Sequence, residues 1–103
     1  MEKIWLESYP SDIPPSIEDL SNNSVLDLIQ NASHKYSQNT AFTSLNSKLS
    51  FKDVEYFSEN FGAYLQHELS IEKGSRVAIM LPNLLTYPVT LLGCYKAAAT
   101  VIN

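Results

Sequence analysis

The sequence predicts an α/β fold with a β-hairpin, three helices and a β-α-β crossover in an incomplete sheet. The crossover is the most informative part. An apolar strand over residues 76–81 follows Gly74, an apolar helix follows Pro82 and Asn83, and a second strand begins at 100–102. Strand, helix and strand in this order are the repeating unit of a parallel sheet. The helix carries a single charge, Lys96, which predicts neighbours on most of its sides. We therefore expect the chain to be the opening piece of a larger protein.

Composition bounds the class of protein. The 103 residues allow one small domain, and 45% hydrophobic residues suffice for a core. The charged fraction is 17%, against about 25% in typical soluble chains, which suits a segment partly covered by more protein. An ordinary domain with a neutral Ser/Asn surface is the alternative.

Charge and hydropathy exclude several functions. The net charge is −4 and the seven Lys and Arg residues are scattered, which argues against binding to nucleic acid. No apolar run approaches the roughly 20 residues of a membrane span, and no signal-peptide core follows Glu2 and Lys3. One cysteine, Cys94, excludes an intramolecular disulfide, so we expect a cytoplasmic location.

Two regions are expected: an extended arm over 1–23 and an incomplete α/β subdomain over 24–103. The arm has prolines at 10, 14 and 15 and no regular period. Its apolar residues predict that it lies along the surface of the following domain rather than being a frayed terminus. These residues are Trp5, Leu6, Tyr9 and Ile13.

Ser24 is expected to cap the first helix, with Asp27 three residues on in a position like that of a capping box. Five apolar residues then share one helical face, and residues 37–39 end the helix. They are Val25, Leu28, Ile29, Ala32 and Tyr36. A strand over 40–45, a turn at 46–47 and a short strand over 48–50 predict a hairpin.

Ser50 is expected to cap the next helix, over 51–69, again with an acid, Asp53, three residues later. An apolar stripe of helical period predicts its packed face, with Glu55 off the stripe. The stripe is Val54, Phe57, Phe61, Tyr64, Leu65 and Leu69.

In the crossover, Gly74 is expected to make the tight turn, since glycine adopts positive φ without steric cost. The continuously apolar run over 77–81 predicts a strand covered on both faces of its sheet. Asn83 is a candidate N-cap for the last helix. A start near Thr86 would place Pro88 in the first turn, and a start at Leu84 would kink the helix.

No catalytic, cofactor-binding or metal-ligating residue is predicted in this chain. Its three isolated glycines make no phosphate-binding loop, and no serine lies in a nucleophile elbow. His34 and His67 are interpreted as solvated, and Cys94 as a buried, inert thiol. Asp53 and Glu55 could be paired acids, but a helix cap and a solvated side chain explain them better.

Several blocks of the sequence occur together: Trp5-Leu6 with Tyr9-Pro10, Leu49-Ser50-Phe51, Arg76-Val77-Ala78, and Pro82-Asn83-Leu84-Leu85 followed by Tyr87-Pro88-Val89. With these blocks the chain resembles the N-terminal segment of adenylate-forming acyl-CoA synthetases, and more narrowly of bacterial long-chain-fatty-acid–CoA ligases. The resemblance spans nearly the whole chain. Two positions, 75 and 98, depart from the family pattern. Ser75 replaces the usual Asp, which changes a side-chain acceptor in the turn. Ala98 replaces the usual Gly, which removes a favourable C-cap.

The resemblance implies that the chain forms the N-terminal part of the large domain of an adenylate-forming enzyme. It also implies a two-step reaction, in which a fatty acid attacks ATP with magnesium assisting, and CoA then displaces AMP from the acyl-adenylate. The family's Ser/Thr/Gly-rich loop, its ATP-contacting residues and its catalytic lysine all come after Asn103. The resemblance therefore carries no catalytic residue into this chain, and we expect the chain alone to be inactive and not to bind ATP.

Two alternatives stay open. A sibling interpretation is another acyl- or aryl-activating member of the superfamily. The alternative from a different class is a stand-alone small α/β interaction module without catalysis. The fragment interpretation predicts self-association through apolar surface from Leu84 to Ala98. It leaves open whether the full-length enzyme associates peripherally with a membrane.

Overall fold

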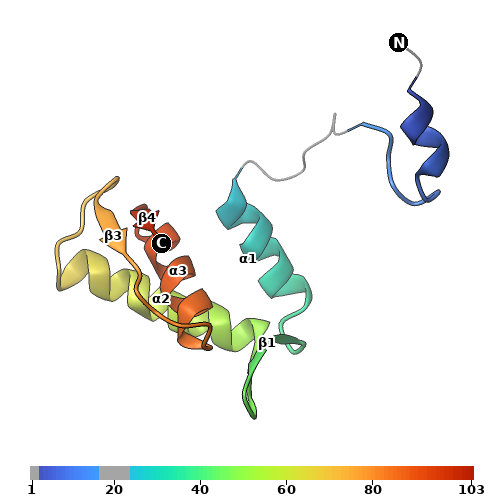
Figure 1. Ribbon diagram of the computed structural model, residues 1–103. Coiled ribbons are helices and arrows are strands. Elements are labelled where there is room, and N and C mark those ends of the chain that lie inside the picture. Colours follow the sequence, from blue (N-terminus) through green and yellow to red (C-terminus); the bar gives the residue numbers. More distant parts are fainter. Residues whose placement is uncertain (1–2, 17–23) are drawn as a thin grey trace.

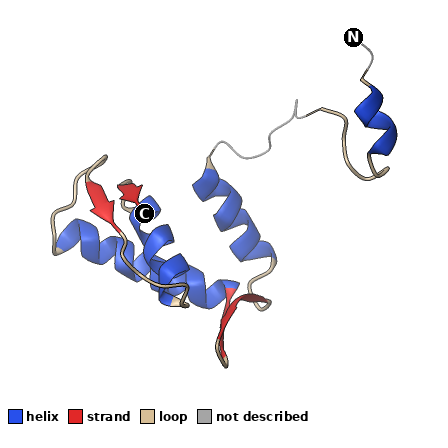
Figure 2. Cartoon of the chain, viewed as in Figure 1, coloured by secondary structure: helices blue, strands red, loops and turns tan. Residues whose placement is uncertain are grey.

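The computed structural model describes residues 3–16 and 24–103 (Figure 1). Strands β1 and β2 form an antiparallel hairpin, and strands β3 and β4 form a parallel pair joined by helix α3. The expected hairpin, three α-helices and crossover are confirmed (Figure 2). The elements in order are η1 (Ile4–Ser8), α1 (Val25–Lys35), β1 (Thr40–Ser44), β2 (Ser47–Ser50), α2 (Phe51–His67), β3 (Arg76–Ala78), α3 (Thr86–Lys96) and β4 (Thr100–Ile102).

The arm is not extended throughout, because Ile4–Ser8 form the 3-10 helix η1. Among residues 3–16 only Leu6 is partly buried. Trp5 is 50% exposed, so its ring is not packed away on a neighbouring surface. Tyr9 and Ile13 are exposed as well, and packing of the arm on the following domain stays a prediction. The rest of the expected arm, residues 1–2 and 17–23, lies outside the described residues.

Helix α1 begins as expected: the backbone N–H of Asp27 donates to Oγ of Ser24 at 3.0 Å. The hairpin follows, with Ser44 paired to Ser47. Its turn is therefore Leu45-Asn46, one residue earlier than predicted. Leu45 takes a φ of 53° and points into solvent, a conformation uncommon for a residue with a side chain.

Helix α2 begins with a complete capping box between Ser50 and Asp53, which confirms the predicted start. The predicted packed stripe is largely wrong. Of its six members only Val54 and Leu65 are buried, whereas Phe57, Tyr64 and Leu69 are exposed. The buried stripe of α2 is instead Val54, Ser58, Gly62 and Leu65.

The reason is the close approach of α3. A Cβ placed on Gly62 would lie 3.0 Å from the carbonyl oxygen of Gly93 in α3. A Cβ placed on Gly93 would lie 2.6 Å from Cδ1 of Phe61 and 3.0 Å from the carbonyl oxygen of Ser58. Only small side chains fit between helices at this separation, so the larger apolar residues of the predicted stripe stay outside the contact.

The crossover is parallel, as predicted, with Val77 opposite Val101. The first strand is shorter than the predicted 76–81: it ends at Ala78, and Met80 is 94% exposed. Val77 and Val101 pack on the core, while the residues that alternate with them face away from it. Within the described residues the sheet is covered on one face, so the prediction of cover on both faces is wrong there. The outward residues are Arg76, Ala78, Thr100 and Ile102.

Helix α3 begins at Thr86, which confirms the start that places Pro88 in the first turn. The N-cap is Leu85, without a side-chain hydrogen bond, so the prediction of Asn83 as N-cap is wrong. The carbonyl oxygen of Asn83 instead accepts a bond of 3.4 Å from Oγ of Ser44 in the hairpin.

The core lies between α2, α3 and the parallel pair, and its buried centre is Leu65, Ile79, Cys94 and Ala97. Two residues with left-handed backbone conformation lie just before the two strands: Gly74, before β3, has a φ of 84°, and Ala98, before β4, has a φ of 55°. The N–H of Gly74 donates to the carbonyl oxygen of Ala98 at 2.8 Å.

Ser75, the other departure from the family pattern, still provides an acceptor in the turn. Its Oγ accepts from the backbone N–H of Glu72 at 3.2 Å. The turn therefore keeps a side-chain acceptor at position 75.

We predict that Ala98→Gly stabilises the chain. A residue with a Cβ in the left-handed region costs about 1–2 kcal/mol, and Ala98 has a φ of 55°. Part of this gain is offset by the greater freedom of glycine in the unfolded chain, so we expect a net gain of about 0.5–1 kcal/mol in the free energy of unfolding, measured with urea. The matched control is Ala63→Gly on the exposed side of α2, which should lose a similar amount. Equal losses at both positions would contradict the prediction.

We predict that Gly93→Ala, in contrast, destabilises the chain. Alanine normally favours a helix interior over glycine, but here the added Cβ would meet Phe61 at 2.6 Å. Overpacking of this kind costs about 1–3 kcal/mol, so the urea midpoint should fall. Thr86→Ala, at an exposed position of the same helix, is the control and should leave the midpoint nearly unchanged. A stabilised Gly93→Ala variant would show that the helices can separate without cost.

Candidate functional site

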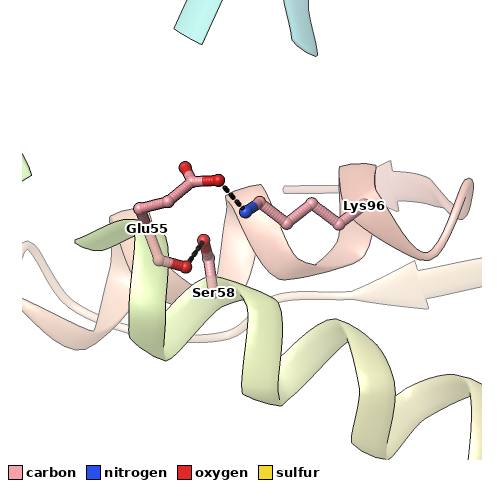
Figure 3. Close-up of polar contacts among 3 residues, drawn as sticks. All are labelled: Glu55, Ser58 and Lys96. Carbon is pink, nitrogen blue, oxygen red and sulfur yellow. Dashed lines mark hydrogen bonds and ion pairs between the residues drawn. The ribbon is translucent and has the colours of Figure 1, made fainter. Parts of the chain in front are cut away.

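A partly buried ion pair lies at the crossing of α2 and α3. Nζ of Lys96 lies 2.6 Å from Oε1 of Glu55, and the Lys96 side chain is only 11% exposed (Figure 3). The prediction of a solvated Glu55 is therefore wrong. The sequence held a usable signal, because the single charge of an otherwise uncharged helix needs an opposite charge wherever it is covered.

The neighbours of the pair are structural. Oγ of Ser58, fully buried one turn along α2, donates to the carbonyl oxygen of Glu55 at 3.0 Å (Figure 3). The second carboxylate oxygen of Glu55 is buried without a hydrogen-bond partner among the described residues, as is Oγ of Ser33 in α1. No nucleophile with its base is assembled among these contacts, so the pair orients the two helices.

The two candidate acids are directed to different partners. Oδ2 of Asp53 accepts from Oγ of Ser50 at 2.6 Å and from its backbone N–H at 2.9 Å. These bonds, the side-chain bond first, lower the pKa of Asp53 because they favour the ionised carboxylate. Asp53 is thus a helix cap and Glu55 an ion-pair partner, and they do not act as paired acids.

The remaining candidate side chains lie apart. His34 is exposed in the last turn of α1, and His67 is exposed at the end of α2, as interpreted from the sequence. Cys94 is fully buried in the core, where desolvation raises the pKa of its thiol. The predicted burial of Cys94 is confirmed, and its inertness, expected of a neutral thiol without access to solvent, stays a prediction.

An apolar groove of about 490 Å³ lies between α1, the hairpin and the start of α3. Leu28 and Ala32 line it from α1, Phe42 from β1, and Leu84 and Leu91 from the chain around α3. Leu28, Phe42 and Leu84 are each at least 42% exposed. An apolar hollow of this size on one side of a small domain is typical of a surface that contacts more protein.

That this chain holds neither a metal nor a nucleotide stays a prediction. Residues 3–16 and 24–103 contain no group of three or more His, Cys, Asp or Glu side chains that could hold a metal ion. The glycines lie at a helix crossing and a single turn rather than in a phosphate-binding loop. Across the described part of the chain, no helix is both long enough and apolar enough to span a membrane.

Curated bacterial relatives match the chain from end to end. A long-chain-fatty-acid–CoA ligase of Yersinia pestis is 41% identical over 103 residues, which are 100% of this chain and 18% of that protein. Proteins of the same name from Haemophilus influenzae and Bacillus subtilis are 36% and 31% identical over 103 and 102 residues. The chain thus spans less than a fifth of the length of the curated relatives it matches.

Solved structures show the same fold at lower identity. An artificially fused adenylation–PCP di-domain, NpsA-ThdA from Klebsiella oxytoca, aligns with a TM-score of 0.73 at 20% identity, covering 77% of this chain and 15% of that one. Apo MbtA from Mycobacterium smegmatis aligns with a TM-score of 0.71 at 22% identity, covering 78% and 15%. A fatty acyl-adenylate ligase from L. pneumophila aligns at 0.69 and 20% identity, covering 84% and 16%.

A family model matches most of the chain and shows the family to which it belongs. The family described as AMP-binding enzyme matches residues 29–103, which include α2, the crossover and most of α1. The matched residues contain the glycine crossing, the parallel pair and both left-handed turn residues. The chain therefore belongs to the AMP-binding enzyme family.

Proposed function

We propose that this chain is the N-terminal portion of a long-chain-fatty-acid–CoA ligase. That enzyme would convert ATP, a fatty acid and CoA into acyl-CoA, AMP and diphosphate through an acyl-adenylate. The observation that carries the proposal is identity of 31–41% along essentially the whole chain to curated ligases of that name. This similarity favours the fatty-acyl branch over another acyl- or aryl-activating member of the superfamily.

The proposed role of this portion is to build the framework of the large domain. The exposed outward face of β3 and β4 and the apolar groove both offer surface for further layers of protein. A stand-alone interaction module would have to leave both surfaces in water, so the framework role is favoured. In isolation, the same surfaces would allow the chain to self-associate. The groove, with Leu84 at its edge, is a better candidate for this than the predicted span from Leu84 to Ala98, because Leu92, Cys94 and Ala97 of that span are buried.

Most of the contacts to ATP, magnesium and CoA would come from parts of the enzyme outside this chain, in keeping with the lack of a metal-ligating cluster among the described residues. Magnesium, bound elsewhere in the enzyme, would neutralise negative charge on the ATP phosphates during adenylation. The contribution proposed for this chain is rigidity, because the crossing of α2 and α3 supports the parallel strands of the framework. We place the whole enzyme in the cytoplasm, in keeping with a single cysteine that stays a thiol.

We predict that the chain can replace the matching segment of a ligase. A chimera that carries residues 1–103 in place of the matched segment of the Yersinia pestis protein should form acyl-CoA from oleate, ATP and CoA. The shared framework predicts a kcat within about tenfold of the parent. A matched control carries the same graft with Gly93→Ala, which should lower the melting temperature because the crossing is overpacked. A folded chimera that forms no acyl-adenylate from any fatty acid would contradict the proposal.

We also predict that the chain alone does not bind ATP. Isothermal titration of residues 1–103 with Mg·ATP should give no binding heat up to millimolar nucleotide, since the described residues lack a metal cluster. The active chimera serves as the positive control under the same conditions. Saturable micromolar binding to the isolated chain would show that a nucleotide site lies within these residues.

A further inference from the structure

One hydrogen bond joins the start of α3 to the residue that follows β4. The hydroxyl of Tyr87 donates to Oδ1 of Asn103 at 2.7 Å, across sixteen residues of sequence. Neither residue belongs to the ion pair or to the helix caps described above. The bond therefore ties the first turn of α3 directly to the residue that follows β4.

The packing of Tyr87 fixes the position of its side chain, which can therefore orient the side chain of Asn103. Its ring is partly buried and packs against the core cluster of Leu65, Ile79, Cys94 and Ala97. Its backbone N–H donates to the carbonyl oxygen of Leu84 at 3.0 Å, which fixes the first turn of α3. A tyrosine has only two side-chain torsions, so a packed ring leaves its hydroxyl little freedom.

Asn103 lies at the carboxyl edge of the parallel pair. Ala78 is paired with Ile102, and the N–H of Ile79 donates to the carbonyl oxygen of Ile102 at 2.9 Å. Both strands thus end at the same edge, and Asn103, which is exposed, is the next residue beyond it. In open α/β sheets, ligands bind in the crevice outside the carboxyl ends of the strands.

We propose that Tyr87 is a positioning residue that orients the carboxamide of Asn103 at this edge. With Oδ1 held by the phenol, the two N–H donors of the carboxamide point away from Tyr87 and are presented to a bound substrate. Such donors suit an anionic oxygen, which the fatty acid carboxylate and the phosphates of ATP both provide. This inference rests on the proposed ligase function and assigns a role in it to two residues of this chain.

The test is Tyr87→Phe in the chimeric ligase, because this change removes the hydroxyl and keeps the packed ring. We expect the KM of one substrate to rise about three- to tenfold, the effect of one hydrogen bond, while kcat changes less. A rise for the fatty acid alone assigns Asn103 to the carboxylate, and a rise for ATP alone assigns it to a phosphate. If neither KM moves, or if only the melting temperature falls, the inference is overturned.

The control variant is Tyr95→Phe, which removes the hydroxyl of an exposed tyrosine on the same helix and should leave both KM values unchanged. A second measurement does not depend on activity. In NMR spectra of the 103-residue chain, Tyr87→Phe should shift the side-chain carboxamide signals of Asn103, whereas Tyr95→Phe should not. Unshifted signals would overturn the inference even if the chimera were inactive, whereas an inactive parent chimera with shifted signals would contradict the proposed function alone.

Discussion

The close approach of α2 and α3 at Gly62 and Gly93 is the constraint on which the rest of the structure depends. A Cβ on Gly62 would lie 3.0 Å from the backbone of α3, so the helices meet without an intervening side chain. This separation lets the carboxylate of Glu55 reach Lys96 at 2.6 Å. It also keeps Phe57 and Tyr64 out of the contact and exposed. Three features that look unrelated in the sequence therefore follow from two missing side chains.

The parallel strands depend on this crossing. A pair of strands with three residue pairs is too short to be stable alone, so its position must come from the helices beneath it. Val77 and Val101 pack on the cluster around Cys94 and Ala97, which the crossing buries. The same packing anchors the ring of Tyr87, so the carboxyl edge of the sheet and the start of α3 are positioned together.

The order and type of the α-helices and strands, together with the two serine caps, could be predicted from the sequence, because periodicity and capping act over a few residues. Features that depend on distant partners could not. Apolar periodicity predicts that the widest hydrophobic stripe of α2 is buried, whereas the close approach of α3 buries Ser58 and Gly62 instead. The lone charge of α3 indicates that Lys96 needs an acidic partner, but the sequence does not identify that partner as Glu55, 41 residues away. The 3-10 helix at Ile4–Ser8 has no side-chain cap that local reasoning could find. The bond between Tyr87 and Asn103 likewise appears only once the crossover has folded.

The turn at Ala98 is fixed by backbone hydrogen bonds rather than by the residue type at that position. Ala98 adopts the left-handed conformation that glycine would take there, although its side chain disfavours it. Hydrogen bonds on both sides impose this geometry: its N–H donates to Tyr95, and its carbonyl oxygen accepts from Gly74. The N–H of Thr100 then donates to the carbonyl oxygen of Ser75 at 2.8 Å, which sets the register of β4. Because the neighbours fix the turn, the exchange of glycine for alanine leaves the strand in place. Asn103 accordingly lies at the carboxyl edge for reasons of backbone geometry, whichever residue stands at position 98.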